Sequence, residues 1–411
     1  MSQRQFLYRT TLTLKRFQST KPTPQAKAST VLTKPAFNEL LSQNQTLHQL
    51  FHSPEPHHSI VEETGNTSND TLNATTTLPI ILRSKTAVFQ QTSKENPEKQ
   101  GTSLKFKQWI EYAKSIIKFY RVGIQNTWRN RKLVKAIKAK YAIVDLQGPA
   151  TIHRQIRNSN DVIEQLSTYL SLKKIEANAL KANLKPPTES VVNITRRELS
   201  LIKRTEPDIW KLPVFTLVLL ICGEMTPFVV YAFPHLTPRT CISSGVLQSL
   251  NSKNNAKFNK KEIKITDIYK LPRGELILMS KLYFLIPNFF TFFPITYYQK
   301  RLALHHSYLK VDDYYLKSVD RETQISGLWN LSKSELIRAN LDRNLIDLSV
   351  TDVEELKADE LKVRLFYYLG LEEGRFSYQD IQKIRNLSWD ESHNIMKWRH
   401  SLANEKLEKS E

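Results

Sequence analysis

The chain has 411 residues, enough for two or three domains, which excludes a single small domain. Sixty lysines and arginines oppose forty acidic residues, so the net charge of +20 favours acidic partners such as nucleic acid or anionic lipid. Two cysteines, ten glycines and the absence of a nucleotide-binding glycine motif argue against a zinc site and an ATP-driven enzyme. We expect no catalysis, cofactor or metal.

The N-terminal hundred residues divide into two predicted segments. Residues 1–21 are basic, contain several hydroxyl side chains and no acid, and lack the unbroken apolar core of a secretory signal. This composition is typical of a mitochondrial transit peptide. Residues 22–100 are rich in Thr, Ser, Asn and Pro without a sustained period, which predicts a disordered linker.

Residues 101–211 are predicted to be a basic helical region. Apolar residues recur every three or four positions between Phe106 and Trp128, which indicates a helix with one buried face. Twelve basic residues and one acid, Glu111, lie between 99 and 140. Such a field attracts the phosphates of RNA or of anionic lipid, although a solvated helix face explains the pattern equally well. The candidate contacts are Arg129, Arg131, Lys132, Lys135 and Lys138.

The most apolar run of the chain, 214–233, contains one ionisable residue, Glu224. A helix of this length is about 30 Å long, which predicts one transmembrane helix over 212–236. Glu224 and Pro227, which removes a backbone donor, are candidates for an ion path, and a neutral glutamate in a helix interface is the alternative. After a linker, 237–275, the aromatic run 276–298 predicts a segment that associates with the membrane without spanning it.

Residues 299–404 carry repeated helix-start signatures, such as Ser332 three residues before Glu335, and predict a multi-helix all-α domain with a tail at 405–411. From residue 320 onward 18 acids face 14 basic residues, so basic proteins are more suitable partners than RNA. Arg338 and Arg343 are the candidate contacts for such a partner, and solvated side chains are the simpler interpretation.

The string TRRELSLIKRTEPDIWKLPVF, followed by GEMTPFVVYAFPHLTP, resembles the signature of the LETM family of mitochondrial inner-membrane proteins. The resemblance implies a membrane-anchored all-α protein whose C-terminal, 14-3-3-like domain faces the matrix and contacts large-subunit proteins of the mitochondrial ribosome. The calcium-binding loop and the coiled-coil tail of that family are missing. The positions that carry the resemblance are Arg196, Arg197, Glu198, Arg204, Thr205, Asp208, Pro213, Glu224, Pro227, Phe233 and Pro234.

These observations predict a non-enzymatic adaptor of the mitochondrial inner membrane that binds ribosomes and supports organelle translation or membrane protein insertion. The alternative is a potassium or calcium/proton exchanger centred on Glu224. An exchanger requires a homo-oligomer, because one helix cannot enclose an ion path.

Overall fold

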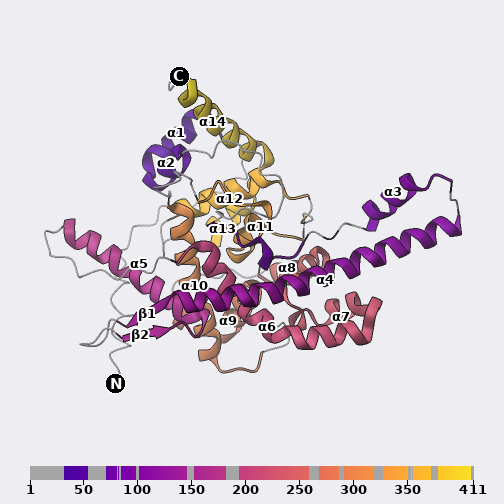
Figure 1. The fold of residues 1–411 in the computed structure, drawn as a ribbon. Helices are drawn as coiled ribbons and strands as arrows, with labels where there is room; N and C mark the ends of the chain where they lie inside the picture. The colour runs from indigo at the N-terminus through magenta and orange to yellow at the C-terminus, as the bar shows by residue number, and fades with distance from the viewer. Residues whose placement is uncertain are drawn as a thin grey trace.

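The computed structural model describes residues 32–53, 71–80, 82, 85–98, 101–145, 152–181, 194–258, 268–286, 291–318, 327–349, 353, 355–371 and 378–408. Regular structure in these ranges is helical except for one antiparallel pair, β1 (Ala142–Asp145) and β2 (Ile152–Gln155), in which Ala142 pairs with Gln155 (Figure 1). The expected all-α fold class is confirmed. The predicted transit peptide lies outside the described residues.

The longest element is α4 (Thr102–Lys140), which confirms the helix predicted from its apolar period. Helix α3 (Lys85–Glu95) packs against its first turns, and α6 (Arg196–Cys222) packs along its middle. Seven residues of α4, spaced mostly three or four apart from Phe119 to Ile137, form its buried stripe. The capping box at the start of α6 is also confirmed, because Thr195 accepts from the backbone of Glu198.

Residues 212–236 do not form the predicted transmembrane helix. Helix α6 ends at Cys222, and a 3-10 turn, η3 (Gly223–Met225), reverses the chain into α7 (Thr226–Ala232) and η4 (Pro234–Leu236). Gly223 has φ +49°, a conformation that glycine adopts without steric cost. No helix in the described ranges combines the length and apolarity that a bilayer crossing needs. The prediction of a single span was therefore wrong.

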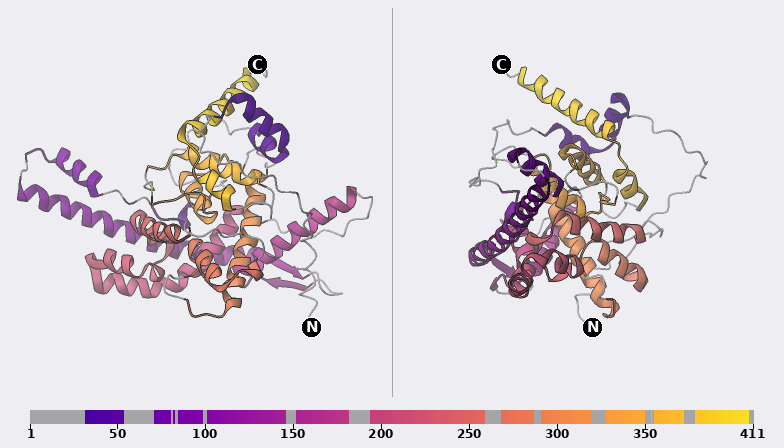
Figure 2. Two further views of the ribbon diagram at one scale, coloured as in Figure 1. Left: turned by 180° about the vertical axis from the view of Figure 1, so that it is seen from behind. Right: turned by 90° about the vertical axis from the view of Figure 1, so that its right-hand side faces the viewer.

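The predicted linker is also wrong where the structure describes it. Helices α1 (Lys34–Gln43) and α2 (Gln45–His52) pack into the core formed by α11 (Lys333–Asp342), α12 (Ala358–Gly370), α13 (Tyr378–Arg385) and α14 (Trp389–Glu408). Phe37 is fully buried there, and Trp329 donates a hydrogen bond to the Leu50 carbonyl at 2.8 Å. Figure 2 shows α1 and α2 beside α14. Residues 22–31 and 54–70 lie outside the described ranges.

Residues 276–286 are largely protein interior, so the predicted membrane association is wrong there, whereas residues 291–296 are mostly exposed, with Phe292 at 68%, and for them it stays a prediction. Leu276, Met279 and Tyr298 are completely buried in a core shared by α8, α9 and α10. Helix α10 also packs against α5, so residue 299 does not begin a separate domain, and the predicted linker 237–275 contains helix α8. The remaining elements are α5 (Ser159–Lys181), η2 (Thr75–Thr77), η5 (Arg239–Cys241), α8 (Ser244–Phe258), η6 (Ile268–Lys270), α9 (Arg273–Leu282) and α10 (Ile295–Lys317).

Candidate membrane-contact surface

The second half of α6 and α7 form a helical hairpin (Figure 1). We call the turn η3 its tip, and the region where α6 contacts η4 and the residues after it its root. At the root, Lys211 donates to the Thr237 carbonyl at 3.3 Å, and the Arg239 amide donates to Asp208 Oδ2 at 2.8 Å. At the tip, the Thr226 hydroxyl donates to the Gly223 carbonyl at 2.6 Å. From Lys211 to Cys222 the helix advances about 17 Å, roughly half the hydrocarbon thickness of a bilayer. The hairpin therefore has the reach of one leaflet.

One face of the hairpin packs against α4, and the opposite face is exposed. Phe215 is buried with its ring centroid 5.6 Å from that of Tyr120. In contrast, Leu220, Ile221 and Phe228 are 77%, 76% and 71% exposed. Large contiguous apolar patches are uncommon on proteins that remain free in water. We call these three residues, together with Trp210, Val214, Leu217, Met225, Tyr231 and Phe233, the apolar face.

Exposed basic side chains occupy the side of α4 that turns away from the hairpin. They recur at helical spacing and lie roughly opposite the buried stripe, because each residue rotates about 100° around the helix axis. Of the exposed basic residues of α4, Lys114 and Lys140 pair with Glu111 and Glu198, whereas the five named next form no ion pair with a described residue. We call Lys118, Arg121, Arg129, Lys132 and Lys135 the cationic face.

The other two predicted patch residues differ from these. Lys138 is bound by the carboxylate of Glu206 and also donates to the Arg157 carbonyl, so it is not available to a partner. Arg131 is exposed and lies 5.2 Å from the centre of the Trp128 ring. The structure thus keeps four of the five predicted contacts accessible and assigns Lys138 to an internal ion pair.

The predicted ion-path residues lie at the hairpin tip. Glu224 belongs to the turn η3, and Pro227 lies in the first turn of α7, where its missing amide removes no helical hydrogen bond. The continuous helix on which the ion-path interpretation depended is not present.

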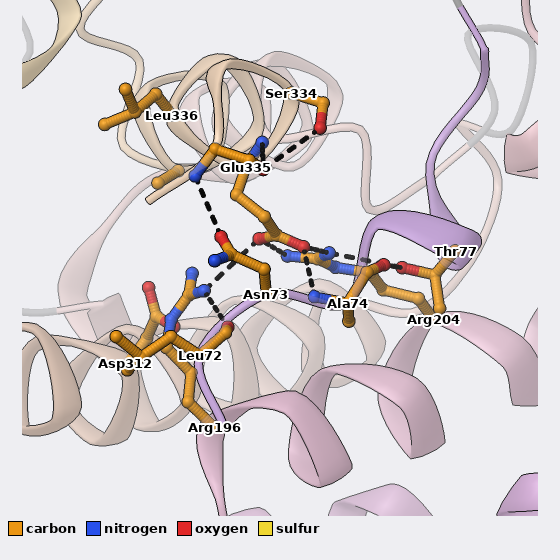
Figure 3. A network of polar contacts seen from close by, with 12 residues as sticks. Leu72, Asn73, Ala74, Thr77, Arg196, Arg204, Asp312, Ser334, Glu335 and Leu336 are labelled. Carbon is orange, nitrogen blue, oxygen red and sulfur yellow. Dashed lines mark hydrogen bonds and ion pairs between the residues drawn. The ribbon is translucent and has the colours of Figure 1, made fainter. Parts of the chain in front are cut away.

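Two of the signature arginines form a buried ion network rather than a contact surface (Figure 3). Arg204 makes a two-pronged contact with Glu335, with distances of 2.6 and 2.9 Å. Arg196 donates to Asp312 Oδ1 at 2.7 Å, to Glu335 at 3.3 Å and to the Leu72 carbonyl at 2.8 Å. Glu335 also accepts from the Ala74 amide at 3.0 Å. The network joins α6, α10, α11 and the segment before η2.

Burial and ion pairing act in opposite directions on these groups. Burial raises the pKa of Glu335, but Arg204 and Arg196 more than offset this effect and the net pKa is lowered. Asp312 behaves alike: burial opposes its ionisation, whereas Arg196 and Arg343 lower its pKa to about 2. The carboxylates are therefore held ionised inside the protein, and these residues have a structural role.

Of the two predicted ribosome contacts, Arg343 is buried and Arg338 is partly buried. Arg343 is 2% exposed and binds Asp312 at 2.7 Å and Asp313 at 2.5 Å. Arg338 is paired with Asp342 at 2.6 Å, and its side chain is 16% exposed. Neither guanidinium is presented at a surface suitable for a ribosome, because the acids of α10 and α11 draw both of them inward.

The other signature residues have local roles around the hairpin. Glu198 caps α6 and accepts from the Tyr141 hydroxyl at 2.9 Å, while Thr205 and Asp208 are buried. Burial raises the pKa of Asp208. Arg197 is half-buried at the start of α6, Pro213 lies within that helix, Phe233 is exposed where α7 ends, and Pro234 begins η4.

Comparison with known proteins decides the family. Residues 72–318 match the Pentamidine resistance factor domain, which covers more than half of the chain. The chain belongs to this family. The Saccharomyces cerevisiae protein "Pentamidine resistance factor, mitochondrial" is 25% identical over 363 residues, covering 77% of this chain and 80% of the relative. No solved structure matches. Since the relative is mitochondrial, membership supports a mitochondrial location.

The family match corrects the resemblance to the LETM family, which was wrong. The strings that suggested it encode a helix cap at Thr195, buried ion pairs at Arg196 and Arg204, and a turn at Gly223. The feature missed by sequence reasoning is the exposed apolar face, and Gly223 in the middle of the apolar run was the signal for the turn that creates it.

Proposed function

We propose that this chain is a non-enzymatic adaptor on the mitochondrial inner membrane, which contacts the bilayer through the apolar face and the mitochondrial ribosome through the cationic face. The observation that carries the proposal is the arrangement of these two faces on opposite sides of the α4–α6 pair. One side suits lipid and the other suits a polyanion. A protein with both can hold a ribosome close to the membrane and raise its local concentration there.

The membrane part of the proposal follows from the hairpin's geometry. Amphipathic helices that lie in the interface bury their apolar side about 5–10 Å into the head-group boundary, which the hairpin can reach without spanning. Each large apolar side chain removed from water contributes about 1.5–3 kcal/mol. Nine such side chains therefore supply enough free energy for stable attachment, even if only part of their area is buried.

Liposome flotation tests this attachment. We expect the wild-type chain to float with vesicles, and the variant L220D/I221D/F228D to stay in the dense fraction because three charges now lie on the apolar face. The matched control L133D/L172D/I175D places three charges at exposed apolar positions elsewhere, and it should float normally. Flotation of the hairpin variant at the wild-type level would contradict the membrane contact.

The ribosome is the proposed partner of the cationic face because ribosomal RNA presents a dense array of phosphates. Each phosphate that a lysine or arginine neutralises releases counterions, so binding should weaken steeply between about 50 and 200 mM salt. Because Arg343 is buried and Arg338 is paired with Asp342, we place the proposed contact on α4 and not on the C-terminal helices.

Co-sedimentation with mitochondrial ribosomes tests this contact. The charge reversal R129E/K132E/K135E should reduce sedimentation and flatten its salt dependence. The control K300E/R301E/K397E reverses three exposed charges outside α4 and should behave like wild type. Equal loss in both variants would mean that only net charge matters, and no loss in the α4 variant would remove the ribosome from the proposal.

A further inference from the structure

A pocket lies where the hairpin rejoins the body of the protein. It is bounded by residues 78–80 and Leu82, η5, the start of α8, and α11. The pocket has a cavity volume of about 100 Å³, and part of the unfilled space around it is open to solvent. Its walls are mainly aliphatic side chains, among them Leu78, Ile80, Ile242, Leu247, Ile337 and Leu341.

Two guanidinium groups, from Arg239 and Arg338, line this otherwise apolar pocket. Arg338 is paired with Asp342, but its Nε is buried without a hydrogen-bond partner. Arg239 uses its backbone amide to bind Asp208, and its side chain forms no hydrogen bond or ion pair with any described residue. Burial, and then the neighbouring charge of Arg338, lower the pKa of Arg239. Asp208 and Asp342 offset part of this lowering. The pocket therefore carries one buried donor without a partner, the Nε of Arg338, and a guanidinium, that of Arg239, which forms no direct ion pair with a described carboxylate.

The lining selects among ligand classes. A nucleotide or sugar would need many hydrogen-bonding groups, whereas the only other polar residues in the lining are Ser244 and Ser334. A neutral hydrocarbon would leave the Nε of Arg338 unpaired. A molecule with an aliphatic tail and one anionic head satisfies both features, because the tail removes apolar surface from water and the head forms charge-assisted hydrogen bonds with the arginines.

We propose that this pocket binds a single anionic acyl amphiphile, with its chain among the aliphatic residues and its carboxylate or phosphate head between Arg239 and Arg338. The pocket lies at the root of the hairpin, since Arg239 follows Thr237 and η4 directly. A lipid that leaves a bilayer beside the hairpin therefore has a short path to it. The site does not depend on the membrane contact proposed above, because it is defined by its own lining.

Calorimetry on the purified full chain tests the site with dodecyl phosphate and dodecanoate below their micelle concentrations. Both should bind with one-to-one stoichiometry. Dodecanol and inorganic phosphate, which each lack one half of the amphiphile, should bind at least tenfold more weakly. Shortening the tail should weaken binding about fourfold per methylene. Equal binding of inorganic phosphate would identify a free-phosphate site, and equal binding of dodecanol would identify an unselective apolar pocket; either result overturns the proposal.

Two variants, R239Q and I80D, locate the bound ligand, and R239K is the conservative control. R239Q removes the unpaired charge and should weaken dodecyl phosphate at least tenfold, whereas R239K should retain most of the affinity. I80D places a negative charge, of the same sign as the ligand's head group, at a lining position. Because Ile80 is 44% exposed, the variant should fold, and its affinity for dodecyl phosphate should fall. Unchanged affinity in both R239Q and I80D would exclude this pocket. All three variants should still float with liposomes, and L220D/I221D/F228D should still bind dodecyl phosphate, which separates this proposal from the membrane contact.

Discussion

The two halves of α6 reverse the usual distribution of polar and apolar residues. The first half buries Arg196 and Arg204, each 1% exposed, while the second half leaves Leu220 and Ile221 more than three-quarters exposed. The buried charges are stable because each guanidinium meets a carboxylate inside the protein. The exposed apolar residues are left largely uncovered by the described part of the chain, so they are accessible to a surface outside it. The same helix thus connects an internal anchor to an external contact.

The largest effect should come from breaking the anchor at Glu335. Its removal in E335A leaves Arg204 buried without its two-pronged partner, and breaking a buried pair costs about 3–5 kcal/mol of unfolding free energy. Urea unfolding followed by circular dichroism measures this loss. The control E355A removes an exposed glutamate and should change the unfolding free energy by less than about 0.5 kcal/mol. Similar stability of the two variants would contradict the anchoring role.

A comparable loss should follow from F37A, because Phe37 is completely buried beside Phe51 and Phe366. Truncating a buried phenylalanine costs about 3–5 kcal/mol. The same substitution at Phe106, which is 70% exposed, is the matched control and should have little effect on urea unfolding. If F37A were as stable as F106A, helix α1 would not belong to the folded core.

Phe37 and Arg204 also show what the sequence could and could not predict. Local features were predictable: the capping box at Thr195 and the buried stripe of α4 depend on residues three or four positions apart. The burial of Phe37 depends on Phe366, and that of Arg204 depends on Glu335, which lies 131 positions away. The hydrophobic period of a single helix cannot predict contacts between residues so far apart in the sequence.

The candidate surface was missed for a different reason. The apolar run 214–233 fits a bilayer in length, and the turn at Gly223, which has a positive φ, divides it into a hairpin. Polar composition likewise led to a linker prediction for 22–100, because the apolar residues of the short helices α1 and α2 are few, although nearly all of them face one core. The basic residues of α4 were predicted from the sequence. Their position on the side of α4 away from the hairpin could not be, because it depends on how α6 packs against α4.

The packing of the hairpin root on α4 can be tested at Gly123. A Cβ there would lie 2.6 Å from Cys241 Sγ and 2.8 Å from the Thr240 carbonyl oxygen. G123A should therefore lower the unfolding free energy by about 1–3 kcal/mol. G245A, in a helix where the added Cβ meets nothing within 4 Å, should be neutral or stabilise by up to about 1 kcal/mol. Equal thermal stability of the two variants would contradict the close approach of η5 to α4.

Acid should weaken the buried ion pairs of Asp312, and it should not affect the apolar face. The pKa of Asp312 is about 2 in the folded protein, below its ordinary value of 3.8, so its stabilising contribution is complete above about pH 4 and is lost as the pH falls towards 2. The contribution is about 2 kcal/mol. D312N should remove this part of the pH dependence of urea unfolding, whereas D390N, at an exposed position, should leave it unchanged. An unaltered acid limb in D312N would contradict the pairing.

The smallest effect on stability should come from the apolar face itself. L220S/I221S changes two side chains that are 77% and 76% exposed, so the unfolding free energy in water should change by less than about 0.5 kcal/mol. The same variant should require more lipid for flotation, because about 1.5–3 kcal/mol per side chain of membrane burial is largely lost. A stability loss of several kcal/mol would instead mean that these residues are covered by the chain itself in solution. The ratio of the two effects therefore decides whether the second half of α6 packs internally, as its first half does, or meets a bilayer.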